Sequence, residues 1–239
     1  WMVSKGRLRS LQNSVPSINV GNNVIATSAG ARNLGVFFDR HLDMRQHILN
    51  TCRICYFQLR QLRVICRHLS KDVLKTLLHA FVSTRLDYCN SLLYGLPQCD
   101  MRKLQSVQNA AARLIGGLRK YDHITILTRD MLHWLPIKQR INFKIAVLTY
   151  KALHQQAPCY ITSMCHLASD SSGLICHRSA TNSELIPASW NSVFYGKRSF
   201  YYAAPKVWNS LPVFTRHQNS LAAFTKDLKT VLFNQAYFA

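Results

Sequence analysis

Four arginines at helical spacing are the residues of this sequence best suited to bind a charged partner. Arg53, Arg60 and Arg67 are seven residues apart, and Arg63 lies beside them. Seven residues make nearly two turns of an α-helix, so these side chains are expected on one helix face. Planar guanidinium groups in a row suit contact with a phosphate backbone. The alternative interpretation is an ordinary solvated helix face.

Two weaker basic groups follow along the chain. The first surrounds the end of a predicted third helix and contains Lys103, Arg113, Arg119 and Lys120. The second contains Lys138, Arg140, Lys144 and Lys151. Tyr121 and Trp134 could stack on bases. Because Trp134 lies in an apolar phrase, packing in the core is the favoured interpretation for it.

Cysteine and histidine pairs raise the question of a zinc site. Cys52 and Cys55 form a CxxC pair, but both fall on the apolar side of a predicted helix, where cysteine behaves as a small hydrophobe. A second group has no spacing typical of a zinc knuckle, and its role stays open: Cys159, Cys165, His166, Cys176 and His177.

No catalytic constellation stands out. Nucleophilic catalysis needs a base next to a thiol or hydroxyl and a third group that orients it, and ten histidines with eight cysteines produce chance pairs. His41-x-Asp43 matches part of an iron-oxygenase pattern, but a helix is predicted directly after it. The chain also contains no two adjacent acidic residues. The sequence therefore predicts a binding protein without catalytic residues or a metal cofactor of its own.

The charge balance favours a polyanionic partner. Lysine and arginine number 30 against 10 acidic residues, which gives a formal net charge of +20. Residues 40–120 alone contain 14 basic and 4 acidic side chains. Such a surplus favours nucleic acid, because each neutralised phosphate releases condensed counterions. A merely soluble basic surface, or a fragment whose acidic partner is missing, would have the same composition.

The amino-terminal residues carry no secretory signal pattern, because Trp1 is followed by Lys5, Arg7 and Arg9 without an apolar run. No stretch is long and apolar enough for a membrane span. We therefore expect reduced cysteines and an intracellular location, nuclear or cytoplasmic. A start at Trp1 also suggests that a preceding segment has been cut away.

Periodicity predicts a mainly α-helical fold with short strands at the start. The stretch 20–24 is typical of a hairpin turn, and residues 34–39 of a short strand. One helix is expected to bury Ile48, Cys52, Cys55, Leu59, Leu62 and Cys66.

Three further helices have recognisable starts. Ser70 is expected to cap a helix that buries Val73, Leu74, Leu77, Leu78, Phe81 and Val82. Asp100 is expected to cap the next, which Gly116 and Gly117 end. Pro136 is expected in the first turn of another. Residues 158–195 are predicted to be rich in loops, and a last helix is expected to follow Ser220.

Six phrases together resemble the carboxy-terminal half of LINE (non-LTR retrotransposon) reverse transcriptases, in that family's order and approximate spacing. They are Asn33–Val36 with Asp39, Arg85–Asn90, Leu104–Arg113, Tyr121–Ile124, Leu132–Pro136 and Ala203–Pro212. The resemblance covers roughly residues 31–235.

The resemblance implies a division of the chain into three parts. Residues 1–39 would be a truncated palm remnant with a hairpin like the primer grip, formed by Leu34, Gly35, Val36 and Asp39. Residues 40–120 would form a thumb-like helical bundle that includes the arginine helix. Residues 121–239 would form a carboxy-terminal helical region. The implied partners are RNA or an RNA–DNA duplex and the missing fingers and palm.

The sequence departs from that family in one decisive respect. The aspartate pair that holds the two Mg²⁺ ions of the parent polymerase has no counterpart here. Two hypotheses therefore remain: a nucleic-acid-binding fragment that grips the template–primer backbone, and a decayed mobile-element relic without activity. Residues 35–67 also resemble a short module named after the amino terminus of an AlkB-homologue methyltransferase, but the residues support neither oxygenase nor methyltransferase chemistry.

Overall fold

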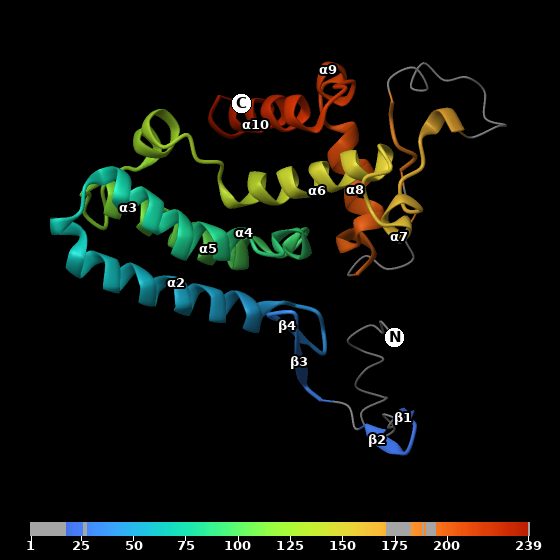
Figure 1. Ribbon diagram of the computed structural model, residues 1–239, viewed down its shortest axis with the longest axis horizontal. Helices are drawn as coiled ribbons and strands as arrows, with labels where there is room; N and C mark the ends of the chain where they lie inside the picture. Colours follow the sequence, from blue (N-terminus) through green and yellow to red (C-terminus); the bar gives the residue numbers. More distant parts are fainter. Residues whose placement is uncertain (1–17, 26–27, 171–182, 188, 190–194, 239) are drawn as a thin grey trace.

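The computed structural model describes residues 18–25, 28–170, 183–187, 189 and 195–238, and this part of the chain is mainly helical (Figure 1). The first described element is the predicted hairpin. Its strands β1 (Ile18–Val20) and β2 (Asn23–Ile25) pair antiparallel. Gly21 in the turn has a φ of +59°, a conformation that glycine adopts without a steric penalty.

A second hairpin joins β3 (Gly30–Asn33) to β4 (Val36–Asp39). Leu34 and Gly35 both have positive φ, as a two-residue type I′ turn requires. They are therefore turn residues and not part of the predicted strand. Val36 is buried in the core, whereas the cross-strand neighbours Arg32 and Phe37 lie on the other face of the hairpin.

Helix α2 (Arg45–Ile65) is the arginine helix predicted from the sequence. It buries Ile48, Cys52, Cys55, Leu59 and Leu62 against α5 (Gln98–Gly116), which confirms the predicted apolar face except for Cys66, which is only partly buried. The α-helix ends one residue before Cys66, and a 3₁₀ turn, η1 (Cys66–His68), continues the chain.

Helix α3 (Lys71–Leu78) begins where predicted, because the Ser70 hydroxyl accepts a hydrogen bond from the Val73 amide. A π-helical turn, η2 (His79–Ser83), then leads into α4 (Thr84–Asp87). The wider π turn suits buried residues at steps of four: Leu74, Leu78, Val82 and Leu86. The predicted burial of Val73 and Phe81 is wrong, since both are exposed.

The predicted cap of α5 is also wrong. Pro97 precedes the helix, and Asp100 lies within its first turn, 1% exposed. Its carboxylate accepts a hydrogen bond from Lys103 Nζ at 2.8 Å and lies 3.7 Å from Arg45 Nε, so it joins α2 to α5. At the other end, the left-handed Gly117 terminates the helix as expected.

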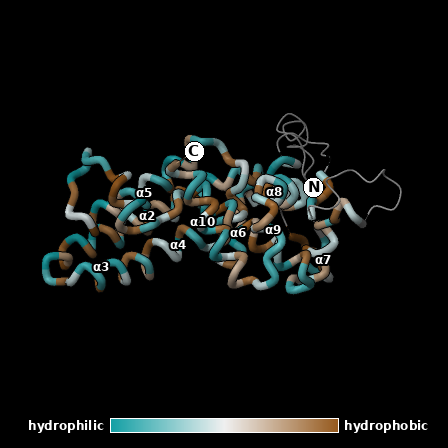
Figure 2. The backbone as a smooth tube through the Cα atoms, turned by 90° about the horizontal axis from the view of Figure 1, so that it is seen from above, coloured by the Kyte–Doolittle hydropathy of each residue, from teal (hydrophilic) through white to brown (hydrophobic). Residues whose placement is uncertain are grey.

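The carboxy-terminal half is built around α6 (Ile137–Leu153), which follows Pro136. α8 (Phe200–Asn209) and α10 (Leu221–Tyr237) pack against it, and the short α9 (Val213–Arg216) precedes α10. α2 and α10 lie at opposite edges of the helical body, with α5 and α6 between them (Figure 1). Hydrophobic and hydrophilic segments alternate along the helices in Figure 2, as expected of helices with one buried face.

Short elements occupy the described part of the predicted loop region. They are α7 (Cys159–Thr162) and η5 (Ala168–Asp170). A 3₁₀ turn, η7 (Gly196–Arg198), follows directly after the predicted region, and another π turn, η4 (Leu127–Met131), lies earlier in the chain. An isolated bridge pairs Leu167 with Leu185. One hydrophobic cluster includes buried residues from Val36 to Leu232. It therefore contains residues from both sides of the predicted boundary at residue 120.

Replacing Trp208 by alanine should be strongly destabilising. Its ring lies 5.7 Å from that of Phe224, which stacks on Tyr150, and its Nε1 donates to the Ser183 carbonyl at 2.8 Å. We expect Trp208→Ala to lower the free energy of unfolding by about 3–5 kcal/mol, measured by urea denaturation. Trp208→Phe keeps a ring and should lose only about 1–2 kcal/mol. Equal losses in the two variants would show that ring packing is not what matters here.

Candidate nucleic-acid interface

The four arginines of the predicted stripe are all exposed. Three of them, Arg53, Arg60 and Arg63, project from α2 away from its buried face. Arg67 differs from the prediction, because it lies in the 3₁₀ turn η1 and not on the helix itself. The stripe (Arg53, Arg60, Arg63 and Arg67) therefore follows α2 and continues one turn beyond its end.

Exposed apolar side chains interleave with the stripe. Tyr56 and Phe57 are 39% and 48% exposed, and Val64 is 74% exposed. The sequence pattern of α2 could have revealed them, since they fall outside the buried positions at steps of three and four. Aromatic side chains beside cations are common where proteins bind single strands, because rings can stack on bases. The outer surface of α2 thus combines positive charge with apolar area.

Among the side chains that the structure describes, no carboxylate neutralises the stripe. α2 contains no aspartate or glutamate, and the structure describes the side chains of nine of the ten acidic residues. None of these nine forms an ion pair with an arginine of the stripe. The carboxylates are engaged elsewhere, for example Asp87 with Arg140 at 2.7 Å. The stripe is therefore a row of positive charge open to an external anion.

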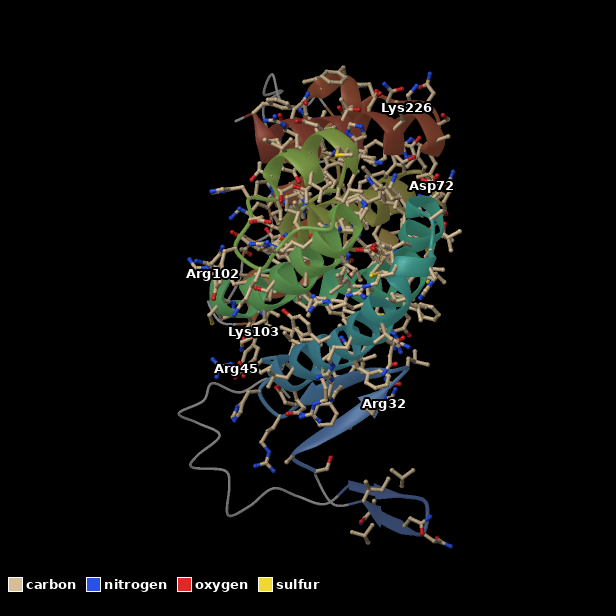
Figure 3. The ribbon with its side chains drawn as sticks, turned by 90° about the vertical axis from the view of Figure 1, so that its left-hand side faces the viewer. Arg32, Arg45, Asp72, Arg102, Lys103 and Lys226 are labelled. Atoms are coloured by element: carbon tan, nitrogen blue, oxygen red, sulfur yellow. The ribbon has the colours of Figure 1, made fainter. Side chains whose placement is uncertain are left out.

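The second predicted group is not brought together as one surface. Lys103 is held by the buried Asp100, and it lies about 15 Å along α5 from Arg113 at 1.5 Å per residue. Arg113 is half-buried, and its guanidinium donates to the Asp122 carbonyl. Arg119 and Lys120 are exposed just beyond the helix. Figure 3 shows Lys103 beside Arg45 and Arg102, where α2 and α5 meet.

The residues predicted to resemble a primer grip lie on the second hairpin. Leu34 is 83% exposed at its tip, and Val36 is buried. Asp39 accepts a hydrogen bond from the Asp43 amide at 2.7 Å. The Tyr88 hydroxyl donates to the Leu34 carbonyl at 2.6 Å and so fixes the hairpin tip against the end of α4. A leucine at positive φ costs strain, and this anchor helps to hold it.

A cleft between this hairpin, α2 and α4 contains two arginines that the sequence analysis missed. The cavity has a volume of about 500 Å³, and Arg32, Arg53 and Arg85 all line it. His47 also lines it, and burial lowers the pKa of this imidazole. The position of Arg32 could have been predicted from a two-residue turn at Leu34 and Gly35, because such a turn places Arg32 directly across from Phe37. Figure 3 shows Arg32 on its strand, apart from Arg45 and Lys103.

The cysteines of the CxxC pair lie in the core. Cys52 and Cys55 are buried on α2, and burial raises the pKa of both thiols, that of Cys55 to about 11. Zinc binds the thiolate, which such an environment disfavours. In the second group, Cys159 is exposed and Cys165 is buried, whereas Cys176 and His177 lie outside the described residues.

The described ranges contain no group of three or more His, Cys, Asp and Glu side chains that could share a metal ion. The expectation that the chain holds no Mg²⁺ of its own stays a prediction, because it was drawn from the lack of adjacent acidic residues in the sequence. Over the same ranges, no helix has the length and apolar character needed to cross a membrane.

Thiol labelling should separate the cysteines by burial. Cys99 and Cys159 are exposed, whereas Cys55 and Cys165 are buried with thiol pKa values of about 11. At pH 8 only about one in a thousand such thiols is ionised. We expect iodoacetamide to modify the exposed pair in the native protein and the buried pair only in denaturant, as mapped by peptide mass spectrometry. Rapid native labelling of Cys55 would contradict its position in the core.

Comparisons with known proteins add no assignment: the chain matches no family model, no curated protein and no solved structure. A functional assignment therefore depends on the charges and contacts described above.

Proposed function

We propose that this chain binds nucleic acid through the arginine stripe of α2, as the thumb and carboxy-terminal region of a LINE-type reverse transcriptase. The observation that carries the proposal is the presence of two different faces on one helix. One face is fixed in the core by Ile48, Cys55 and Leu59, and the arginines of the stripe are exposed without carboxylate partners.

The expected ligand is a duplex of RNA or of RNA and DNA, held by its backbone. Guanidinium groups form two parallel hydrogen bonds to phosphate oxygens, and such contacts carry no base sequence information. Tyr56 and Phe57 add apolar area beside the cations. The proposal therefore predicts binding that depends strongly on salt and weakly on sequence.

Nucleotide addition is not part of the proposed function. Two-metal polymerisation requires carboxylates that hold both ions close to the transferred phosphate, and this chain has no adjacent acidic pair. Fingers and palm would have to come from other segments or from another protein. Those segments are proposed as the second partner.

Charge reversal of the stripe should weaken duplex binding. In the variant with Arg53, Arg60, Arg63 and Arg67 all replaced by Glu, we expect affinity for an RNA–DNA duplex to fall at least tenfold. The slope of log affinity against log salt should also decrease, by about three to four, because roughly one counterion is released per phosphate contact. Fluorescence anisotropy at several salt concentrations measures both quantities.

A matched variant controls for net charge. Replacing Lys197, Lys206, Lys226 and Lys229 by Glu changes the net charge equally. These exposed residues lie on η7, α8 and α10, outside the predicted basic groups, and α10 is at the edge opposite α2 (Figure 1). This variant should lose less affinity and keep its salt slope. If both variants lose binding equally, overall charge and not the stripe accounts for it.

Thermal unfolding tests the alternative of a decayed relic. The buried cluster from Val36 to Leu232 predicts one cooperative transition with coincident far-UV and near-UV circular dichroism. A decayed chain without specific packing would instead lose its structure gradually, with different curves for the two signals. A gradual, noncoincident transition would therefore favour the relic and contradict a working binding module.

A further inference from the structure

The cleft beside the stripe brings together cations from three separate elements. Arg32 comes from β3, Arg53 from α2 and Arg85 lies in α4, and all three line the same cavity of about 500 Å³. All three are exposed at the surface. The convergence is a product of the tertiary fold, since 53 residues separate the first from the last.

The three arginines have no anionic partner in the part of the chain that the structure describes. No carboxylate lines the cavity, and no ion pair in the described ranges involves Arg32, Arg53 or Arg85. Like charges around one cavity repel each other, and this repulsion is relieved when an anion binds between them. A phosphomonoester carries a charge of about −1.5 to −2 near neutral pH, compared with about −1 for a backbone phosphodiester. The cleft is therefore better matched to a terminal phosphate than to an internal one.

The remaining lining suits the nucleoside that carries such a phosphate. Phe37, Ile54 and Tyr88 supply ring and apolar surface, and Asn50 and Thr51 supply hydrogen-bonding groups. A cavity of this volume lies in the range typical of small-ligand sites. This volume is sufficient for one nucleotide but not for a double helix.

The walls of the cleft are held in place by specific contacts. The Tyr88 hydroxyl bonds to the Leu34 carbonyl, which fixes the hairpin to the end of α4. Gly35 lies against the Tyr88 ring, where an added Cβ would be 3.6 Å from the ring carbon. Val36 anchors the hairpin from its other face, in the core. These contacts hold the hairpin that carries Arg32 in a fixed position relative to α4, which carries Arg85.

We propose that this cleft binds the phosphorylated terminal nucleotide of a nucleic-acid strand, with the phosphate on Arg32, Arg53 and Arg85 and the nucleoside against Phe37 and Tyr88. The inference rests on the proposed function, because it places a strand end next to the backbone-binding stripe, with Arg53 shared between the two sites.

Oligonucleotide binding with and without a terminal phosphate tests the inference. Three short single-stranded RNAs of the same sequence are compared by anisotropy: one with a 5′-phosphate, one with a 3′-phosphate and one with hydroxyls at both ends. We expect one of the phosphorylated strands to bind at least tenfold more tightly than the hydroxyl strand. Equal affinity for all three would overturn the proposal.

Paired variants locate the effect. The double variant Arg32→Gln with Arg85→Gln should remove the preference for the phosphorylated strand, and the control Arg60→Gln with Arg63→Gln should lower all affinities while the preference remains. These four residues are exposed, and none has an ion pair in the described ranges, so the substitutions spare the core. Loss of the preference in the control, or its survival in the cleft variant, would place the phosphate elsewhere and overturn the assignment.

A small-ligand measurement separates this inference from the proposed function. Adenosine monophosphate should raise the Tm of the wild-type protein by about 2 °C or more and leave that of the cleft variant unchanged, whereas adenosine should have no effect. Inorganic phosphate tests whether the anion alone raises the Tm. A rise equal to that with adenosine monophosphate would overturn the nucleoside part of the proposal. If the cleft binds the nucleotide but stripe reversal leaves duplex affinity unchanged, the proposed function fails and the cleft stands.

Discussion

A shortage of carboxylates is the constraint on which the surface of this protein depends. Ten acidic residues face thirty lysines and arginines, and several of the ten are used to hold the fold together. Asp100 is buried between α2 and α5, and Asp87 pairs with Arg140 of α6. Other carboxylates lie at the surface but pair with a cation of their own segment, as Asp72 does with Lys75 and Asp130 with Arg129. Among the residues that the structure describes, no carboxylate pairs with the stripe or the cleft, and we propose external anions as their ligands.

Several of the phrases that carry the family resemblance contain residues that connect one element to another by hydrogen bonds. Gln105 accepts a hydrogen bond from the Ile137 amide at the start of α6, and Gln108 donates to the Leu135 carbonyl, so two phrases are connected directly. Gln108 is only 3% exposed, so this bond also satisfies a buried amide. Asn209, from the last phrase, both donates to and accepts from Leu185.

This arrangement explains why those phrases give little direct information about chemistry. Residues such as Gln105 and Asn209 are needed at fixed positions because their hydrogen bonds set how one helix meets the next element. The residues proposed to contact nucleic acid lie mostly outside the phrases, on the exposed side of α2. Arg85 and Tyr88 are exceptions, since they belong to one phrase and also line the cleft. The same short segment thus positions the hairpin and contributes to the proposed binding site.

Local periodicity was sufficient to predict α2, the cap at Ser70 and the last helix, because each of these depends on side chains three or four residues apart. It could not predict the π turns, where buried residues follow steps of four, nor α8, whose interior Pro205 argues against a helix when read alone. The stripe could be predicted because it lies along one helix and its end. The cleft could not, since its arginines meet only after the second hairpin and α4 have packed against α2.

Both proposed sites depend on the same property of α2. Its buried face fixes the rotation of the helix, because turning it would expose Ile48 and Cys55 and bury charge. Arg53 is therefore held where the stripe meets the cleft, and it can serve a backbone phosphate on one side or a terminal phosphate on the other. Since one guanidinium cannot fully satisfy both anions, a strand end in the cleft should compete with a backbone contact at Arg53 and leave Arg60 and Arg63 free for the duplex. The two sites are thus coupled through a single side chain.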